Sequence, residues 1–475
     1  MLKKFKDNIS QFSSKLKGVS TKHAINIMGK IIKNSSPQQS VNMMSVLEFI
    51  APNKELKEQM SFVKKDFAAK GPWWGLLTKF FTNVNSNCRE KLIHNLVVNH
   101  SFGSEQKRKE FFKKEKFMPP AFIVISPSMT CNIHCFGCYA SEYSKKDDLP
   151  FEVFDRVINE AKEMGTHFFT ISGGEPFFNK DVFKIFAKHD DCYFLVYTNG
   201  TLIDQKLAKK LAKLGNVAPA ISVEGFEKET DKRRGKGAWK RINDAMDNLK
   251  KEGVIFGFSA TPTRINSDIL ASEKFVDYFI KKGCMFGWFF QYIPIGRKPD
   301  VELMATPKQR NELRKFIHNF VRVKKSIFIG DFWNDGPMVG GCMAGGSLYL
   351  HINVRGDVEP CVFTHFAVDN IKNKPLKECL KSKFFKVLRD RVQSTRAAHP
   401  SSDNLLTPCA IIDNPQVLRD CVREGNARPT HDGAETIICD KKIIKHLDNY
   451  SKEYHALVDS VWKKDYCKKC SKGKK

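Results

Sequence analysis

Residues 128–139 read Ser-Met-Thr-Cys-Asn-Ile-His-Cys-Phe-Gly-Cys-Tyr and place Cys131, Cys135 and Cys138 in a C-x3-C-x2-C spacing. A short apolar stretch ends just before them, so the thiols lie on a loop that follows a predicted strand. Three thiolates on one loop can bind three irons of a cubane cluster and leave the fourth iron open to another ligand. A structural zinc site needs a fourth protein ligand, and His134 is crowded between two of the cysteines. The stretch therefore predicts an iron–sulfur site with an open position.

Strand and helix patterns alternate about six times beyond this point. The expected strands are 121–125, 167–172, 193–198, 219–223, 255–261 and 285–293, and the expected helices begin near Pro150 and cover 182–189, 204–214, 239–251 and 273–282. Such alternation gives a parallel sheet with right-handed crossovers. Six units predict an α/β fold, a partial (β/α)6 TIM-like barrel, with functional groups at the carboxyl ends of its strands.

The rest of the chain divides around this barrel. We expect a basic helical region at 1–115, the barrel at 116–325, a small cysteine-rich extension at 326–425, and a helix with a Lys/Cys-rich tail at 426–475. In the first region, apolar residues at helical spacing form one stripe: Leu2, Phe5, Ile9, Phe12, Leu16 and Val19. A basic amphipathic helix of this kind either lies on an anionic membrane or packs on the protein's own core.

The cysteine loop and the turn Ile171-Ser-Gly-Gly-Glu-Pro176 together resemble the radical S-adenosylmethionine (radical SAM) enzymes. The resemblance implies a 4Fe-4S cluster on the three cysteines and SAM chelated at its open iron. It places the SAM amino group at Gly173, Gly174 and Glu175. Asn199, at the end of the third strand, matches the corresponding strand end of the family.

Two further residues complete the implied SAM site. Ser222, at the end of the fourth strand, and Arg234, twelve residues on, resemble the pair that holds the SAM carboxylate and ribose in peptide-modifying members. Arginine suits a carboxylate because its planar fork can bond it bidentately. Arg233 is an equal candidate by position. Glu224 either belongs to this site or caps the following helix.

A second set of cysteines lies beyond the barrel. Cys342 and Cys361 are separated by the pattern C-x13-G-x4-C, which resembles the opening of the SPASM and twitch extensions that bind auxiliary iron–sulfur clusters. The dense later group of four cysteines of a full SPASM domain is absent from the sequence. One auxiliary 4Fe-4S cluster is therefore expected, on Cys342, Cys361, Cys409 and Cys421. The alternative is that these are buried thiols without a metal.

The predicted function is that of a radical SAM enzyme, of the oxidoreductase or transferase type. The resemblance implies reductive cleavage of SAM to a 5′-deoxyadenosyl radical, which abstracts a hydrogen from the substrate, with a peptide as the first expectation. Radical modification of a lipid or isoprenoid at the membrane surface is the second. A non-catalytic iron–sulfur electron carrier or scaffold is the alternative of a different class, although a carrier needs no SAM site.

Charge and composition set the expected surroundings. The chain of 475 residues has a formal net charge of +27, which favours an anionic partner such as a membrane surface or an acidic peptide. Nucleic acid is not expected, since no aromatic–basic motif is apparent. Fourteen cysteines without a visible leader indicate metal binding in a reducing cytoplasm, with a peripheral position at the inner face of the membrane left open. The implied chemistry also needs an electron donor such as flavodoxin or ferredoxin.

Overall fold

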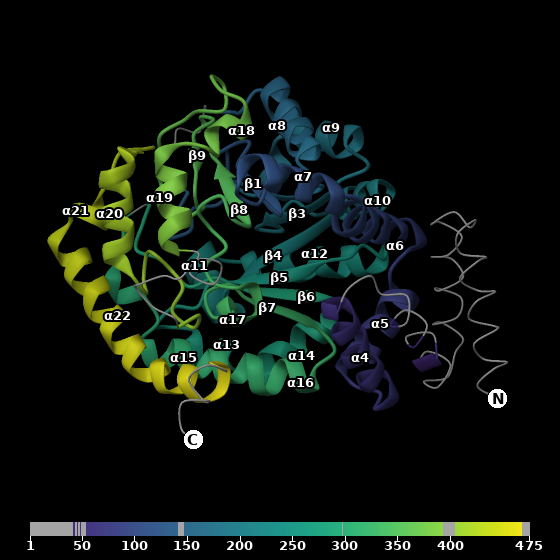
Figure 1. Cartoon of the computed structure of the whole chain (residues 1–475). Helices are drawn as coiled ribbons and strands as arrows, with labels where there is room; N and C mark the ends of the chain where they lie inside the picture. Colours follow the sequence, from purple (N-terminus) through teal and green to yellow (C-terminus); the bar gives the residue numbers. More distant parts are fainter. Residues whose placement is uncertain are drawn as a thin grey trace.

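The computed structural model describes residues 41–42, 45, 48, 54–140, 147–296, 298–392 and 404–467. The amphipathic stripe predicted for residues 2–19 lies outside the described residues. A nine-stranded sheet in the order β7-β6-β5-β4-β3-β2-β1-β8-β9 forms the centre of the molecule (Figure 1). Its strands are β1 (Phe122–Ile125), β2 (Phe168–Ile171), β3 (Tyr193–Thr198), β4 (Val217–Val223), β5 (Gly257–Ala260), β6 (Phe286–Phe289), β7 (Phe328–Asp331), β8 (Tyr349–Ile352) and β9 (Val358–Glu359).

The sheet confirms the predicted parallel α/β barrel and extends it. The six predicted strands are neighbours in sequence order and are all parallel. Two strands from beyond residue 325 continue the parallel sheet at its edges, because β7 pairs with β6 and β8 pairs with β1. The strand expected at 285–293 ends earlier, at Phe289, and the chain then leaves the sheet. The division of the chain at residue 325 stays a prediction, since one sheet spans it.

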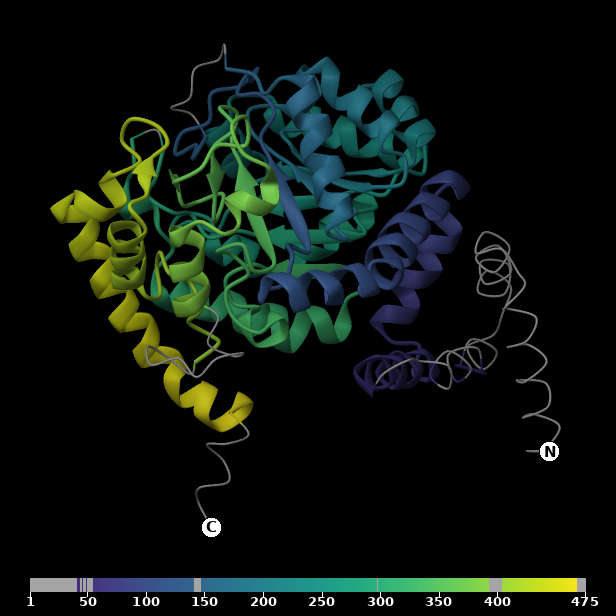
Figure 2. The same ribbon diagram turned by 45° about the horizontal axis from the view of Figure 1, so that its top comes forward.

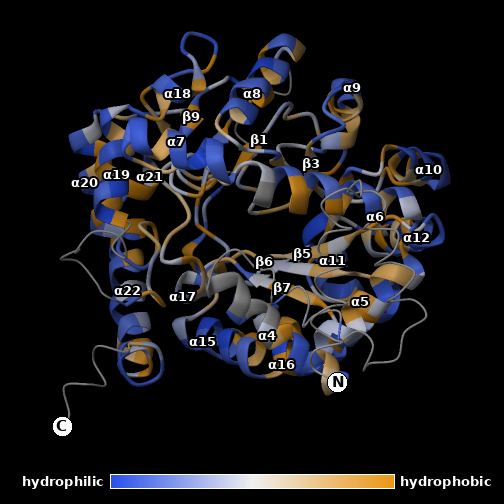
Figure 3. Ribbon diagram, turned by 45° about the vertical axis from the view of Figure 1, so that its right-hand side comes forward, coloured by the Kyte–Doolittle hydropathy of each residue, from blue (hydrophilic) through white to orange (hydrophobic). Residues whose placement is uncertain are grey.

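Helices cover the outer face of this sheet, with hydrophilic residues facing outward (Figure 3). The connections between the strands also contain three further helices, α11 (Glu227–Arg234), η3 (Val301–Leu303) and α16 (Arg322–Lys324). The helices on the outer face are α8 (Phe151–Glu163), α9 (Lys180–Lys188), α10 (Gln205–Leu214), α12 (Ala238–Lys251), α13 (Ser267–Leu270), α14 (Glu273–Lys282), α15 (Pro307–Phe316) and η4 (Ile317–Val321). Local signals set their ends: Asp204 accepts a hydrogen bond from the Leu207 amide at the start of α10, and Gly215 ends that helix with a φ of 74°. The apolar stripes of these helices and the outer face of the sheet form one large core.

The N-terminal helices pack against the turns that precede the strands. They are α4 (Lys54–Ala68), α5 (Pro72–Asn83), α6 (Ser86–Leu92), η1 (Ile93–Gly103) and α7 (Glu105–Glu115), drawn in purple to blue in Figure 2. The Asn85 side chain donates to the Glu252 carbonyl before β5, and Asn95 donates to the Cys192 carbonyl before β3. Phe80 and Phe81 share a hydrophobic cluster with Leu195 on the inner face of β3. These helices therefore close the amino end of the barrel.

The C-terminal part wraps around β8 and β9. It contains α17 (Gly336–Val339), β10 (Phe366–Ala367), α18 (Leu376–Cys379), α19 (Lys383–Val392), α20 (Pro415–Gly425), β11 (Arg428–Pro429), α21 (Thr436–Cys439), α22 (Lys441–Val461) and η5 (Trp462–Tyr466). One short helix of the barrel, η2 (Pro176–Phe178), follows β2. Arg310 of α15 is fully buried and bonds Asp413 with two nitrogens, and its guanidinium lies 3.7 Å from the Tyr454 ring centre. This buried pair fixes α22 and the segment before α20 against the barrel. Within the described residues, no helix is long and apolar enough to cross a membrane.

Candidate functional site

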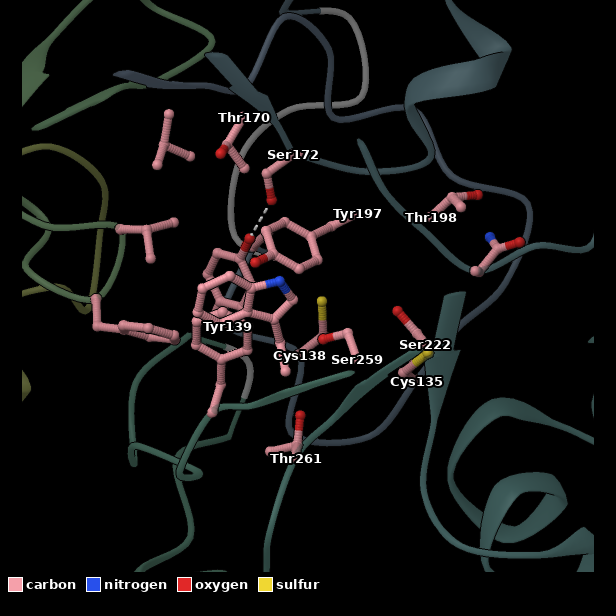
Figure 4. Close-up of a pocket in the computed structure, with 18 of the residues that line it drawn as sticks. Cys135, Cys138, Tyr139, Thr170, Ser172, Tyr197, Thr198, Ser222, Ser259 and Thr261 are labelled. Atoms are coloured by element: carbon pink, nitrogen blue, oxygen red, sulfur yellow. Dashed lines mark hydrogen bonds between the residues drawn. The ribbon is translucent and has the colours of Figure 1, made fainter. Parts of the chain in front are cut away.

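The candidate site is a cavity of about 290 Å³ at the carboxyl ends of the barrel strands (Figure 4). The thiol-bearing loop forms one wall, and residues of β1 to β6 and β8 and of the segments that follow strands form the rest. The predicted residues that line it are Cys131, Cys135, Cys138, Gly173, Gly174, Asn199, Ser222 and Arg234. The structure therefore brings together the residues of five sequence segments in one cavity, as the barrel topology requires.

The three thiols of the loop are half-buried, and Cys135 and Cys138 act electrostatically on Cys131. Burial raises the pKa of Cys131, and the neighbouring acidic groups Glu175, Cys135 and Cys138 raise it further. A set of thiolates at this spacing repels itself unless a cation lies between them. The electrostatics therefore fit an iron–sulfur cluster as the species that holds the three sulfurs together.

The Gly-Gly turn after β2 passes directly beneath the cysteine loop. A Cβ on Gly173 would lie 2.4 Å from the Ser128 carbonyl oxygen, and a Cβ on Gly174 would lie 2.3 Å from the Thr130 carbonyl oxygen. The Gly174 amide donates to the Ser128 carbonyl at 2.9 Å. Glycine is needed here because any side chain would push the two backbones apart. The turn therefore supports the cluster loop besides lining the cavity.

Glu175 is buried and accepts hydrogen bonds behind the cavity wall. Its carboxylate accepts from Thr198 Oγ1 at 2.7 Å and from the Asn199 amide at 2.7 Å. Burial raises the pKa of Glu175 to about 7, although these hydrogen bonds oppose the shift. Its side chain is absent from the residues that line the cavity. In this structure Glu175 ties the ends of β2 and β3 together.

Asn199 links the end of β3 to the cysteine loop. Its amide nitrogen donates to Asn132 Oδ1 at 2.8 Å and lies 3.8 Å from Cys131 Sγ. Its side-chain oxygen accepts from the Thr201 amide at 2.9 Å. The residue therefore orients the first cysteine of the loop, a role that the motif alone did not indicate.

Glu224 holds the two candidate arginines. Its Oε2 accepts from Arg233 Nη1 at 2.7 Å, and its Oε1 accepts from Arg234 Nη2 at 2.6 Å. Arg233 also reaches the Gly137 carbonyl, and Arg234 Nη1 lies 4.0 Å from Cys135 Sγ. Both arginines line the cavity, so the choice between them stays open. The Glu224 carboxylate is thus held by these two ion pairs. The carboxylate that accepts a backbone hydrogen bond at the start of α11 is that of Glu229, and the donor is the Phe226 amide.

Sequence reasoning missed several residues that line the same cavity. Hydroxyl side chains line it from β2 and β5 and from the residues just after these strands (Figure 4), and these residues are Thr170, Ser172, Ser259 and Thr261. Tyr139, next to Cys138, shares a 2.6 Å hydrogen bond with Ser172. The signal was present, because Thr170/Ser172 and Ser259/Thr261 are alternate polar positions in otherwise apolar strands, and alternate residues face one side of a sheet.

Three of the four predicted auxiliary cysteines lie together in the C-terminal part. Burial raises the pKa of Cys342 well above its ordinary value, and the nearby Cys409 and Cys361 raise it further. The Cys361 sulfur lies 2.7 Å from the Tyr349 hydroxyl, at the start of β8. Residues far apart in the sequence thus present three sulfurs to one buried region, as a second cluster needs.

Cys421 lies on α20 in a different environment. Burial raises the pKa of its thiol to about 12, and the charged groups that act on it are Arg391, Glu424 and Asp420. Cys421 shares a buried hydrophobic cluster with Cys361 and Cys409, but no other cysteine is among the groups that shift its pKa. Its role as the fourth ligand stays a prediction. The described residues also hold no group of three His, Cys, Asp or Glu that could bind a single metal ion.

Comparison with known proteins defines the class of this fold and site. Residues 125–265 match the radical SAM superfamily, and residues 342–411 match SPASM, an iron-sulfur cluster-binding domain. The solved structure of Streptococcus suis SuiB bound to its precursor peptide SuiA covers 64% of this chain and 74% of that chain, with a TM-score of 0.53 and 18% identity. That likeness supports the fold, a radical SAM barrel with an extension.

Sequence relatives agree with this class. The Fe-coproporphyrin III synthase of Methanosarcina barkeri is 30% identical over 34% of this chain, and the match spans 43% of that protein. The PqqA peptide cyclase of Streptomyces rochei is 23% identical over 54% of this chain and 75% of that protein. The chain therefore contains a region of the radical SAM superfamily and, after it, a SPASM-type region. Radical SAM chemistry requires a 4Fe-4S cluster and SAM, and SPASM domains bind further iron–sulfur clusters.

Proposed function

We propose that this protein cleaves SAM reductively at a 4Fe-4S cluster held by Cys131, Cys135 and Cys138, and that it modifies a peptide. The observation that carries the proposal is the cavity in which these thiols meet Ser222 and the arginine pair. When bound, the cluster and SAM supply a 5′-deoxyadenosyl radical that abstracts a hydrogen from the substrate. The protein supplies the position of both and excludes water.

The residues of the cavity fit the two ends of SAM. Arg233 and Arg234 offer a positive charge for a carboxylate beside the thiol loop, and Glu224 holds both guanidinium groups in place. Ser222 and Ser259 lie opposite each other in the register of β4 and β5, so their hydroxyls offer hydrogen bonds to a ribose.

A peptide is favoured as substrate by the relatives and the charge. SuiB has been solved with a precursor peptide, and the PqqA peptide cyclase is named for a peptide. The net charge of +27 suits an acidic peptide. The Fe-coproporphyrin III synthase supports a different substrate, so the choice depends on the chemistry of the cavity.

The test is anaerobic reconstitution with iron and sulfide, followed by SAM and dithionite. We expect release of 5′-deoxyadenosine from the wild-type protein and none from Cys135→Ala. Cys284→Ala is the matched control, because that thiol is fully buried between α14 and β6 and lies outside the cavity. A fully reconstituted wild-type protein that releases no 5′-deoxyadenosine would refute the proposal.

A further inference from the structure

The second cysteine set has a tyrosine beside it to which the proposed function gives no role. Tyr349 is the first residue of β8, and its hydroxyl oxygen lies 2.7 Å from the Cys361 sulfur. The residue is 1% exposed, and it is one of those that line the cavity. Among the described residues that line the cavity, none is a cysteine of the second set. Tyr349 therefore reaches from the cavity wall to the second set.

The pairing of β8 with β9 explains the contact between Tyr349 and Cys361. The two strands are antiparallel, and His351 lies opposite Glu359. Continuing this register by two residues on each strand brings Tyr349 opposite Cys361. Side chains of opposite residues in an antiparallel pair lie on the same face, with Cβ atoms about 4.5–5.5 Å apart. The register of one strand pair thus places the phenol at the sulfur.

Packing holds the ring of Tyr349 in this position. The Phe122 ring stacks on it with ring centres 5.1 Å apart, and the Phe332 ring meets it edge to face at 5.7 Å. The Tyr349 amide donates to the carbonyl of Met343, the residue after Cys342. A side chain that its neighbours hold in this way keeps its polar group in one place. The hydroxyl is therefore preorganised at the sulfur.

The chemistry of the contact decides which atom donates. A cysteine that binds iron is a thiolate, which has lone pairs and no proton. A phenol has one O–H, so the hydroxyl has to donate and the sulfur has to accept. Two backbone amides also lie near sulfurs of the set, that of Phe363 at 3.5 Å from Cys361 and that of Ile411 at 3.3 Å from Cys409. The hydroxyl contact is the shortest of these three.

A hydrogen bond to a ligand sulfur changes the reduction potential of an iron–sulfur cluster. Reduction adds a negative charge, and a hydrogen-bond donor stabilises an acceptor more strongly when the acceptor carries more charge. The reduced form therefore gains more from the donor than the oxidised form does. The effect is strengthened in a buried site because the local dielectric constant is low. A buried donor at a ligand sulfur thus raises the potential.

We propose that the Tyr349 hydroxyl donates a hydrogen bond to the Cys361 sulfur and thereby raises the reduction potential of the auxiliary cluster. Tyr349 acts through Cys361, so it is a positioning residue rather than a catalytic one. The inference goes beyond the proposed function, because it concerns the second cysteine set and does not depend on SAM cleavage.

The test measures the potential of the auxiliary cluster alone. Replacing Cys131, Cys135 and Cys138 by alanine in the full chain leaves the second set as the expected iron site. After anaerobic reconstitution, a redox titration followed by electron paramagnetic resonance gives the potential. Adding Tyr349→Phe, which removes the hydroxyl and keeps the ring, should lower it by about 59 mV, a tenfold change for a one-electron couple. An unchanged potential would contradict the inference.

Tyr193→Phe is the matched control, because it removes the same atom from another buried ring. Tyr193 of β3 is 3% exposed and belongs to the hydrophobic cluster of Phe80 and Phe81, outside the cavity lining. We expect this variant to leave the potential of the auxiliary cluster unchanged. Equal shifts in Tyr193→Phe and Tyr349→Phe would show a general effect of losing a buried hydroxyl and would overturn the inference.

A change of donor strength separates hydrogen bonding from shape. Site-specific incorporation of 3-fluorotyrosine at position 349 keeps the ring and makes its O–H a stronger donor, because fluorine withdraws electrons from the phenol. The potential should then rise, whereas Tyr349→Phe lowers it. Shifts of the same sign in the two proteins would show that packing, and not the hydrogen bond, controls the potential, and would refute the inference.

Two further results would overturn the inference. A triple alanine protein without iron would lack the cluster that the hydroxyl is inferred to act on. A visible phenolate-to-iron absorption band that disappears in Tyr349→Phe would make Tyr349 an iron ligand instead of a hydrogen-bond donor. Both results are obtained without SAM, so release of 5′-deoxyadenosine in the separate activity test still decides the proposed function.

Discussion

The two cysteine sets of this chain present the same ligand in opposite surroundings. Cys131, Cys135 and Cys138 come from one loop, are half-buried and line a cavity. Cys361 and Cys409 are buried, and with Cys342 they are brought together from a stretch of almost seventy residues. The first set is open to a small molecule, whereas the second is enclosed by protein. We expect this difference to separate the roles of the two sets, because an iron with an open position has to reach a cavity, whereas a fully ligated cluster does not.

The largest expected effect comes from removing each set in turn. Replacing Cys131, Cys135 and Cys138 by alanine should abolish 5′-deoxyadenosine release and leave about four irons per chain. Replacing Cys342, Cys361 and Cys409 should also leave about four irons but retain SAM cleavage without substrate. Iron analysis and chromatography of the products check both results. Loss of all iron in the first variant would contradict the predicted auxiliary cluster.

A smaller effect is expected from replacing Glu224, which holds Arg233 and Arg234 beside the first cysteine set. Glu224→Gln leaves Arg233 and Arg234 with a neutral partner, and breaking one side of a buried ion pair costs about 3–5 kcal/mol. We expect SAM affinity to fall by about tenfold or more, with the iron content unchanged. Equilibrium dialysis with labelled SAM measures it. Glu302→Gln is the control, because that carboxylate pairs with Arg264 at an exposed position.

The next prediction concerns the pH dependence of stability, which we expect Asp331, the last residue of β7, to influence. Burial, together with the nearby Asp335, raises the pKa of Asp331 to about 6, and its Oδ1 has no hydrogen-bond partner among the described residues. The native state therefore binds this proton more tightly than the unfolded state, so the carboxylate lowers stability as pH rises from about 4 through 6.

Asp331→Asn should remove this cost. We expect the variant to be more stable than the wild type at pH 7 by on the order of 2 kcal/mol, with the gain shrinking toward pH 5. Urea unfolding at several pH values provides the measurement, and Asp247→Asn on the exposed face of α12 is the control. A gain that does not depend on pH would show that the titration of Asp331 is not its source.

The smallest expected effect concerns Cys421, the predicted fourth ligand of the second cysteine set. Cys421→Ala should leave iron content and SAM cleavage unchanged, since the charged groups that shift the pKa of this thiol are Arg391, Glu424 and Asp420 and include none of the other three cysteines. Cys361→Ala, assayed in parallel, should lower the iron content. A loss of about four irons in Cys421→Ala would instead make Cys421 the fourth ligand, as the sequence predicts.

The sequence by itself determined the parts that depend on local order. The barrel and the cluster loop were predicted from the cysteine spacing, the Gly-Gly turn and the strand–helix alternation. These are properties of short segments: three thiols lie within eight residues, and the period of the apolar residues changes from 2 in a strand to 3.6 in a helix. The six strands β1–β6 follow that pattern, and their carboxyl ends lie where the motifs do. Chain order also fixed which strands are neighbours, since crossovers are short and right-handed.

Only the tertiary structure decided what depends on residues far apart in the chain. It added β7 and β8 to the two edges of the sheet, bound Arg233 and Arg234 to Glu224, turned Glu175 away from the cavity and placed Phe80 and Phe81 behind its apolar wall. These facts arise from packing across long stretches of chain, and no spacing rule encodes which buried surface a helix will cover. The apolar part of the cavity wall is a consequence of that packing.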